Sequence, residues 1–163
     1  MMSFKNTPVR LLLGKMEKSP AAAPKARRIV VLYDKAAAWE SARRFLQAAI
    51  CQDLRRIQPV AWCFDALATP SGRMAGALDL AKSDVLLVAT SDAASIPTPA
   101  KHWLSAAFAG LRGGTGLMVA LLGQAGGRTA AHATDLRLLQ RTAAAAGWSF
   151  RAPEPDAFGP TPV

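Results

Sequence analysis

The sequence predicts an α/β protein: a three-layer sandwich in which a parallel sheet lies between two layers of helices. Short apolar runs of strand length alternate with stretches of helical periodicity from Ile29 to Phe150. A parallel strand needs a crossover helix and is buried on both faces, so it is expected as an unbroken apolar run. The 163 residues are enough for one such domain with a tail at each end.

The first strand and helix are expected to begin at about residue 28, where a basic N-terminal stretch ends. The run from Ile29 to Tyr33 is apolar, and Asp34 follows it as a candidate N-cap for a helix that reaches to about Arg56. Arg43 and Arg44 fall on the solvated side of this helix. Its buried stripe is expected to comprise Ala42, Phe45, Leu46, Ala49, Ile50 and Leu54.

The second strand is predicted from Val60 to Phe64, after Pro59 has ended the helix. Thr69 and Pro70 then fit the N-cap and first position of a short helix. The run from Asp84 to Thr90 predicts the third strand. Because its apolar residues leave no polar face, we expect this strand at the centre of the sheet.

The second half of the chain repeats this alternation. Thr98 and Pro99 predict the cap and first turn of another helix. Glycines end that helix, and the run from Leu117 to Leu122 predicts a fourth strand that ends at Gly123. The apolar residues of the helix recur at helical spacing and are Ala100, Trp103, Leu104, Ala107, Phe108 and Leu111.

The last helix is expected from about Thr129 to Ala146, with Gly147 as its C-terminal cap. The segment from Trp148 to Phe150 predicts a short fifth strand at an edge. Five strands with a helix after each of the first four favour the flavodoxin-like order 2-1-3-4-5. The buried side of the last helix is predicted to comprise Ala133, Leu136, Leu139 and Ala143.

Charge is concentrated at the N-terminal end of the chain. The formal net charge is +9, and residues 1–28 hold seven basic side chains against Glu17 alone. We therefore expect residues 1–27 to be a basic, disordered arm, residues 28–151 the flavodoxin-like domain and residues 152–163 a proline-rich, disordered tail. Phe4 is the only aromatic ring of the arm, so nucleic acid is not expected as a partner despite the charge.

The apolar runs are too short to cross a bilayer, so no membrane association is expected. The run from Leu11 to Leu13 is also too short for an export signal, which favours a cytoplasmic protein. Cys51 and Cys63 have neither CxxC nor metal-ligand spacing, and we expect both to be reduced.

Open parallel sheets bind ligands beyond the carboxyl ends of their strands, where the strand order reverses. The glycine-rich turn after the fourth strand, GQAGGRT, could hold an anion on its amides although it lacks P-loop spacing. The candidate binding residues selected by this rule are Tyr33, Asp34, Thr90, Ser91, Asp92, Ser95, Pro97, Gly123 and Gly126.

No catalytic residue and no metal ligand is predicted. Asp34, Asp65 and Asp92 lack the paired acids and the lysine expected of a receiver-type phosphorylation site. His102 and His132 are expected on helix surfaces rather than as general bases. No nucleophile-elbow motif occurs in the chain.

Residues 90–105, TSDAASIPTPAKHWLS, resemble the segment after the third strand in NADPH-dependent FMN reductases of flavodoxin-like fold. The resemblance implies that residues 90–97 line the edge of a flavin, that FMN is the cofactor and that the chain forms a homodimer. The matching positions are Thr90, Ser95, Ile96, Pro97, Lys101, Trp103 and Leu104.

Two functions remain open. The loop from Asp34 to Ala38 has no hydroxyl side chain and no glycine, and its acid would repel a phosphate group. This favours a domain without catalytic activity or cofactor that acts as a binding or regulatory module for a small molecule, a protein partner or a second copy. The alternative is an FMN-dependent NAD(P)H reductase with an atypical phosphate-binding loop.

Overall fold

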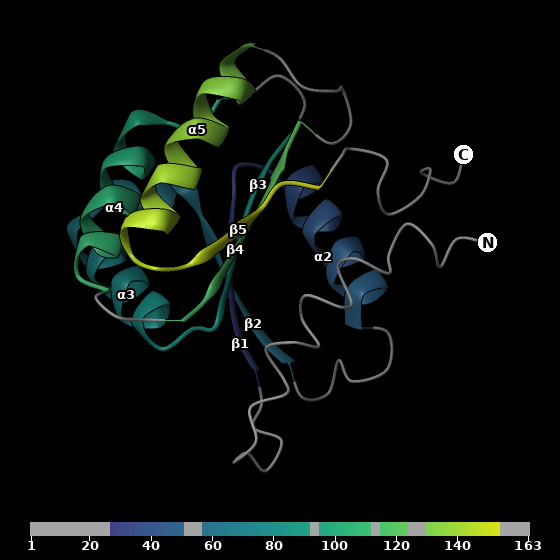
Figure 1. Cartoon of the computed structure of the whole chain (residues 1–163), viewed down its shortest axis with the longest axis horizontal. Coiled ribbons are helices and arrows are strands. Elements are labelled where there is room, and N and C mark those ends of the chain that lie inside the picture. Colours follow the sequence, from purple (N-terminus) through teal and green to yellow (C-terminus); the bar gives the residue numbers. More distant parts are fainter. Residues whose placement is uncertain (1–26, 51–56, 92–94, 112–114, 124–129, 154–163) are drawn as a thin grey trace.

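Strands and helices alternate along the chain (Figure 1). The computed structural model describes residues 27–50, 57–91, 95–111, 115–123 and 130–153. The arm and the tail expected from the sequence therefore lie almost wholly outside the described residues. The elements in chain order are β1 (Arg27–Tyr33), α2 (Ala36–Ile50), β2 (Ile57–Cys63), the 3-10 helix η2 (Phe64–Ala68), α3 (Pro70–Ala81), β3 (Val85–Thr90), α4 (Thr98–Ala109), β4 (Leu117–Leu122), α5 (Ala130–Ala145) and β5 (Ser149–Arg151).

The strands form one parallel sheet in the order β2-β1-β3-β4-β5. β3 lies at the centre, and every residue of β3 and of β4 is buried. Burial on both faces explains why these strands have unbroken apolar sequences. The predicted three-layer α/β sandwich with a flavodoxin-like strand order is confirmed.

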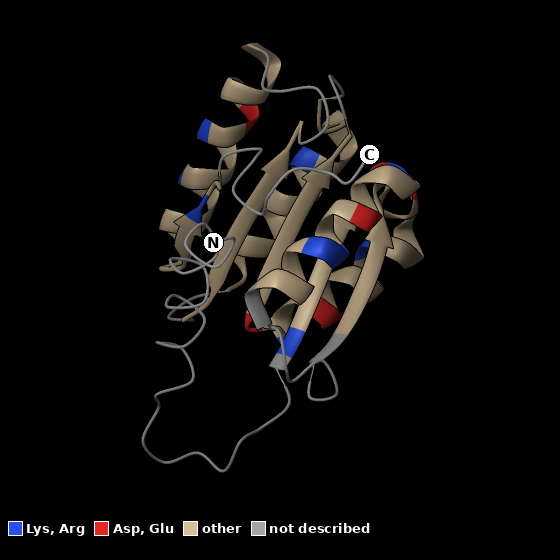
Figure 2. Cartoon of the chain, turned by 90° about the vertical axis from the view of Figure 1, so that its right-hand side faces the viewer, with Lys and Arg blue, Asp and Glu red and all other residues tan. Residues whose placement is uncertain are grey.

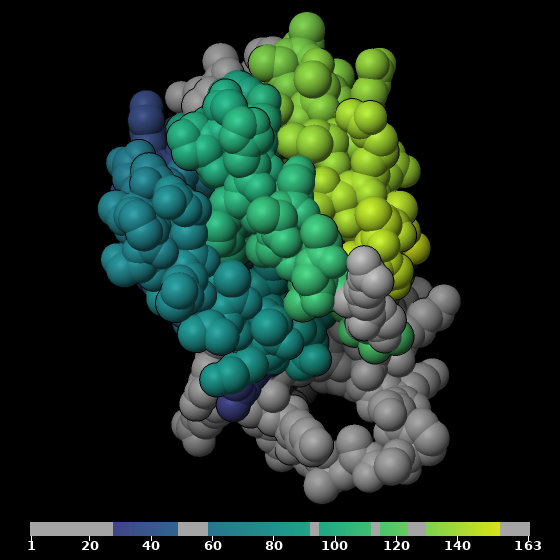
Figure 3. All heavy atoms as spheres, turned by 90° about the vertical axis from the view of Figure 1, so that its left-hand side faces the viewer, coloured from purple at the N-terminus to yellow at the C-terminus, as the bar shows by residue number. Residues whose placement is uncertain are grey.

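The described helices are distributed over both faces of the sheet. α3, α4 and α5 lie side by side on one face (Figures 1 and 3), over a core that includes Leu32 and Trp103. α2 lies on the other face and packs mainly on β1 and β3, where Phe45 shares a core with Leu87. Neighbouring residues of a strand point to opposite faces, so each strand contributes to both cores.

The predicted start of α3 is confirmed. Thr69 Oγ1 accepts a hydrogen bond from Gly72 N at 3.1 Å, and Pro70 is the first helical residue. Residue 72 must also be a glycine for steric reasons, because a Cβ at Gly72 would lie 1.8 Å from Ala66 O of η2. The cap and the glycine together fix the angle between η2 and α3.

β2 differs from its predicted limits at both ends. It starts at Ile57 rather than Val60, so Pro59 lies inside the strand instead of ending the preceding helix. Phe64 is not part of the strand and begins η2. β2 is an edge strand with one neighbour, and an edge position tolerates proline, which explains the first difference.

The start of α4 also corrects a prediction. Pro97 is the N-cap residue, and Lys101 N donates to Pro97 O at 3.0 Å, so Thr98 lies inside the first turn and does not cap the helix. Pro99 is tolerated there because the first amides of a helix have no intrahelical acceptor. The predicted stripe is confirmed at Ala100, Trp103, Leu104 and Phe108, which are buried.

The buried side of α5 agrees with the prediction at Leu139 and Ala143 and differs from it near the start of the helix. Ala133 is exposed, whereas His132 and Asp135 are fully buried. The predictions of a buried Ala133 and a surface His132 were therefore wrong. Both errors have one cause: polar residues occupy part of the inward side, so a pattern taken from apolar residues alone is displaced.

Gly147 ends α5 as predicted, with a φ of 78° in the left-handed region that favours glycine. Trp148 follows and meets Phe108 edge-on, with 5.1 Å between the ring centroids. Gly116 lies against the same indole, since a Cβ there would be 2.4 Å from the ring. This close approach fixes the short edge strand β5 beside β4.

Arg43 and Arg44 of α2 are exposed, as predicted. Figure 2 marks the positions of Lys and Arg along the ribbon. Arg43 Nη1 pairs with Glu40 Oε1 at 3.6 Å, and both side chains are about half exposed. Exposed pairs of this kind contribute little to stability. In the described parts of the chain, no helix is long and apolar enough to cross a membrane.

Candidate ligand-binding site

The candidate site lies at the carboxyl ends of β1, β3 and β4. From β1 the chain moves to β2 on one side and later to β3 on the other, so the strand order reverses between β1 and β3. Of the nine candidate residues, Asp92 and Gly126 lie outside the described residues. The other seven end or follow these three strands. A ligand crevice is expected at such a reversal.

The Asp34 carboxylate connects the ends of β1 and β3, between which the strand order reverses. Asp34 follows β1, and its Oδ1 and Oδ2 accept hydrogen bonds from Ser91 N at 3.0 and 3.1 Å. Ser91 Oγ, after β3, donates to Asp34 Oδ2 at 3.0 Å. Hydrogen bonds to an ionised carboxylate are stronger than neutral ones. The pair therefore joins the ends of the two strands that define the crevice.

This use of Asp34 corrects the sequence prediction that it caps α2. In the first turn of α2, Ala38 N and Trp39 N both donate to Lys35 O, at 2.9 and 3.1 Å. The Asp34 carboxylate instead accepts from Lys35 N at 2.7 Å and from Ser91. The parallel register places Tyr33 beside Ala89, so the residues after the two strands are adjacent, which the sequence alone does not reveal.

Negative charge at this position opposes a phosphate ligand. A phosphate at the end of a strand is normally held by free backbone amides and hydroxyl groups. Here the Ser91 amide and hydroxyl both donate to Asp34. A phosphate would have to displace the carboxylate and would also be repelled by it.

Two aromatic rings lie at the same end of β1. Tyr33 and Trp39 are each partly buried, with 6.0 Å between ring centroids and 40° between ring planes. Cys63 Sγ, at the end of β2, donates to Asp34 O at 3.7 Å. These groups give the β1 side of the site an apolar, aromatic boundary.

Thr90 and Gly123 close the β4 side. Thr90 is buried, and its O and Oγ1 each accept from Gly123 N at 3.3 Å. Gly123 has a φ of 65°, so it turns the chain away at the end of β4. The described contacts of both residues hold the crevice edge together.

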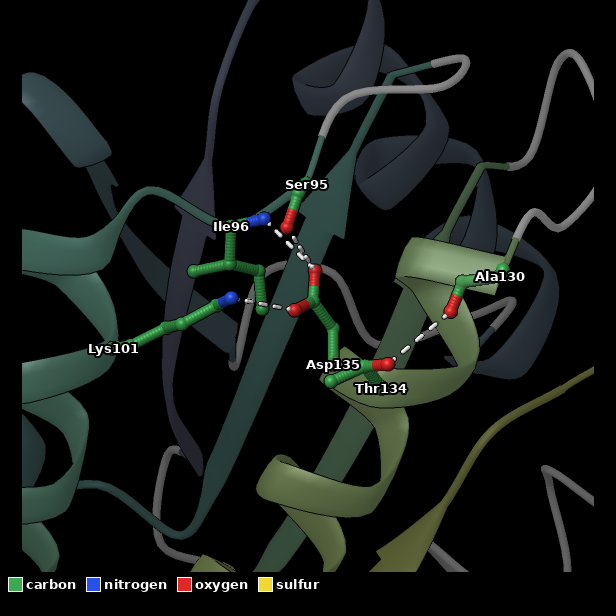
Figure 4. A network of polar contacts seen from close by, with 6 residues as sticks. All are labelled: Ser95, Ile96, Lys101, Ala130, Thr134 and Asp135. Atoms are coloured by element: carbon green, nitrogen blue, oxygen red, sulfur yellow. Dashed lines mark hydrogen bonds and ion pairs between the residues drawn. The ribbon is translucent and has the colours of Figure 1, made fainter.

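The loop from β3 to α4 is held by a buried polar network (Figure 4). Asp135 of α5 accepts from Ser95 Oγ and Ile96 N through Oδ2, each at 2.9 Å. Its Oδ1 lies 3.0 Å from Lys101 Nζ of α4. One carboxylate thus joins the loop, α4 and α5. Ser95 and Pro97 remain exposed on the outer side of this loop.

Asp135 is the site residue that sequence reasoning missed. It is fully buried, and the sequence places it three residues after His132 and four before Leu139. Two polar residues at helical spacing from a buried leucine would have indicated that the inward side of α5 carries a polar cluster. His102, in contrast, is exposed on α4 as predicted.

Other predicted residues are not brought into the site. Asp65 lies in η2 and is exposed. In the ranges that the structure describes, no three His, Cys, Asp or Glu side chains are grouped so as to hold a metal ion.

The fold is that of a flavodoxin-like α/β domain, and the candidate ligand site lies at the β1–β3 reversal. No protein-family model matches the chain, and a search of curated proteins finds none with significant similarity.

Proposed function

We propose that this chain is a binding domain without catalytic activity whose crevice accepts a small ligand that lacks a phosphate group. The Asp34–Ser91 contact is the observation that carries this proposal, because it places a carboxylate where flavodoxin-like domains need phosphate-holding donors. The free Cys63 thiol agrees with the reducing cytoplasm expected for the protein.

The hydroxyl groups of the crevice support a binding role. Ser91 Oγ donates to Asp34, and Ser95 Oγ donates to the buried Asp135. Each hydroxyl therefore fixes a loop in place through a carboxylate. A fixed, preorganised crevice is suited to binding, since less conformational freedom is lost when a ligand enters.

The second candidate function is an FMN-dependent NAD(P)H reductase with an atypical phosphate-binding loop. Tyr33 and Trp39 favour it, because partly buried aromatic rings at the crevice could stack on a flavin. The homodimer that accompanies this alternative is part of the same proposal.

Flavin titration separates the two functions. We would titrate FMN and riboflavin, which lacks the phosphate, against the wild type, Asp34→Ser and the control Asp65→Ser. The control removes an exposed carboxylate outside the crevice. Flavin fluorescence would report binding.

The binding-domain proposal expects colourless protein and no quenching of FMN fluorescence by the wild type or by Asp65→Ser. Any gain of FMN affinity should be confined to Asp34→Ser, because only that variant removes the repelling charge. A yellow purified protein, or quenching by micromolar wild type, would establish the reductase alternative as the better account.

A further inference from the structure

Asp34 brings a negative charge to the candidate ligand site, and no described cation neutralises it. Within the described residues Asp34 belongs to no ion pair, and neither does the exposed side chain of the neighbouring Lys35. The groups that contact the Asp34 carboxylate are the neutral backbone amides of Lys35 and Ser91 and the Ser91 hydroxyl. Because Asp34 is only partly buried, its charge attracts a cation to the ends of β1 and β3.

The acceptor positions of the Asp34 carboxylate are already occupied. Oδ1 accepts from Lys35 N at 2.7 Å and from Ser91 N at 3.0 Å. Oδ2 accepts from Ser91 N at 3.1 Å and from Ser91 Oγ at 3.0 Å. A carboxylate offers about four acceptor positions. A ligand with N–H donors would have to compete with these protein donors, so the site favours a cation that forms no hydrogen bond of its own.

The aromatic rings at the end of β1 suit such a cation. Tyr33 directly precedes Asp34, and Trp39 lies in the first turn of α2, with 6.0 Å between the two ring centroids. Both rings pack against the core beneath α2 and are only partly buried. The face of an aromatic ring attracts a cation within about 6 Å, and quaternary ammonium groups are characteristically bound in this way. The end of β1 therefore offers two rings and a carboxylate, and all three favour positive charge.

We propose that the ligand of this site is a small organic cation with a quaternary ammonium group. The inference rests on the proposed binding function and names the chemical class of its ligand. The Asp34 carboxylate attracts the positive charge without accepting a hydrogen bond from it, and the exposed parts of Tyr33 and Trp39 contact the methyl groups. The hydrogen bonds from Ser91 are kept when the ligand binds, so the ends of β1 and β3 do not have to move.

Two other kinds of cation fit this site less well. Hard metal ions such as Mg²⁺ and Ca²⁺ take about six or more oxygen ligands. In the stretches of chain that the structure covers, no three His, Cys, Asp or Glu side chains are grouped to supply them. A primary ammonium group brings three N–H donors, which would displace the amide and hydroxyl groups that now bind Asp34.

The test compares choline with the uncharged dimethylbutanol in which a carbon atom replaces the choline nitrogen. Isothermal titration calorimetry at low ionic strength measures affinity, and proton NMR reports contact of the methyl groups with an aromatic ring as an upfield shift. We expect the full-length wild type to bind choline about tenfold more tightly than the uncharged alcohol. Ethanolamine, a primary ammonium, should bind more weakly than choline. Equal affinity for choline and the alcohol, or tighter binding of ethanolamine, would overturn the proposal.

Point variants assign the effect to the named residues. Asp34→Asn removes the charge and keeps one acceptor oxygen, and it should weaken choline binding about tenfold. Asp65→Asn makes the same change at an exposed residue of η2 and should bind choline like the wild type. Wild-type affinity in Asp34→Asn would overturn the proposal.

A second pair of variants tests the ring contact and does not depend on the folding of Asp34→Asn. Trp39→Leu should weaken choline binding and reduce the upfield shift, whereas Trp39→Phe, which keeps a ring, should retain most of both. Thermal unfolding of each variant shows whether it is folded. Equal choline binding by Trp39→Leu and the wild type would contradict the proposed contact.

Phosphocholine and FMN separate this inference from the proposed function. Phosphocholine carries the quaternary ammonium of a lipid headgroup together with a phosphate, and it should bind more weakly than choline because Asp34 repels the phosphate. Tighter binding of phosphocholine would assign the site to a phosphate-bearing headgroup, contrary to both proposals. If the wild type binds neither choline nor FMN, the ligand class is wrong and the proposed function stands. Binding of FMN by the wild type would overturn the proposed function itself.

Discussion

Lys101 of α4 and Asp135 of α5 form an ion pair in which Nζ and Oδ1 are 3.0 Å apart and the carboxylate is wholly buried. The lysine reaches the carboxylate from the surface, with about a quarter of its side chain exposed. The same carboxylate accepts from Ser95 and Ile96. A single residue therefore holds two helices and the loop that borders the crevice.

Removing this carboxylate should be costly. Asp135→Ala would leave Lys101 and two hydrogen-bond donors without their acceptor, and a buried donor left unsatisfied costs about 1–3 kcal/mol. Urea denaturation followed by circular dichroism would measure the loss. Asp135→Asn, which retains one acceptor oxygen, should lose less stability than Asp135→Ala. A wild-type midpoint in Asp135→Ala would show that the network adds no net stability.

The Asp34–Ser91 contact should also contribute to stability. Asp34→Ala removes the acceptor of a partly buried amide and hydroxyl, and we expect a loss of about 1–2 kcal/mol. Asp65→Ala is the matched control, because Asp65 is exposed, and it should change stability by no more than about 0.5 kcal/mol. Thermal unfolding of the three proteins makes the comparison. Equal losses in the two variants would contradict a specific role for the contact.

The threonines that precede Pro70 and Pro99, at the starts of α3 and α4, should respond differently to substitution. Thr69→Ala removes the side chain that accepts from Gly72 N, and loss of an N-cap costs about 1 kcal/mol. Thr98→Ala removes a side chain inside the first turn of α4, so a change within about 0.5 kcal/mol is expected. Denaturant midpoints would distinguish them. A larger loss of stability for Thr98→Ala than for Thr69→Ala would indicate that Thr98 caps α4, as the sequence predicted.

Glycine substitutions test the packing of Trp148. Gly116→Ala would force the indole to move, because the new Cβ would lie 2.4 Å from it, and overpacking of this kind costs about 1–3 kcal/mol. At Gly110 the nearest atom would be 3.5 Å away and φ is −83°, so Gly110→Ala should be neutral within about 0.5 kcal/mol. Tm reports stability, and near-UV circular dichroism reports the indole environment. If Gly116→Ala kept both signals, the close approach would be unimportant.

The crevice was predicted only in outline. The rule for parallel sheets selected Tyr33, Asp34, Thr90 and Ser91 from their positions at strand ends, and the structure brings them to one edge. The rule did not reveal that Asp34 binds Ser91 rather than capping α2. A cap is a local contact between neighbours in sequence, whereas this contact joins residues that are 57 positions apart.

The sequence by itself determined the strands, the helices and their order, because unbroken apolar runs and helical spacing are properties of short segments. It also located α3 and the end of α5, where Thr69 and Gly147 act on adjacent backbone groups. Only the tertiary structure decided that Asp135 and His132 are buried and that Asp34 contacts Ser91 instead of capping α2. Those features depend on which segments meet across the sheet, and the energy that buries a polar residue comes from partners that are remote in sequence.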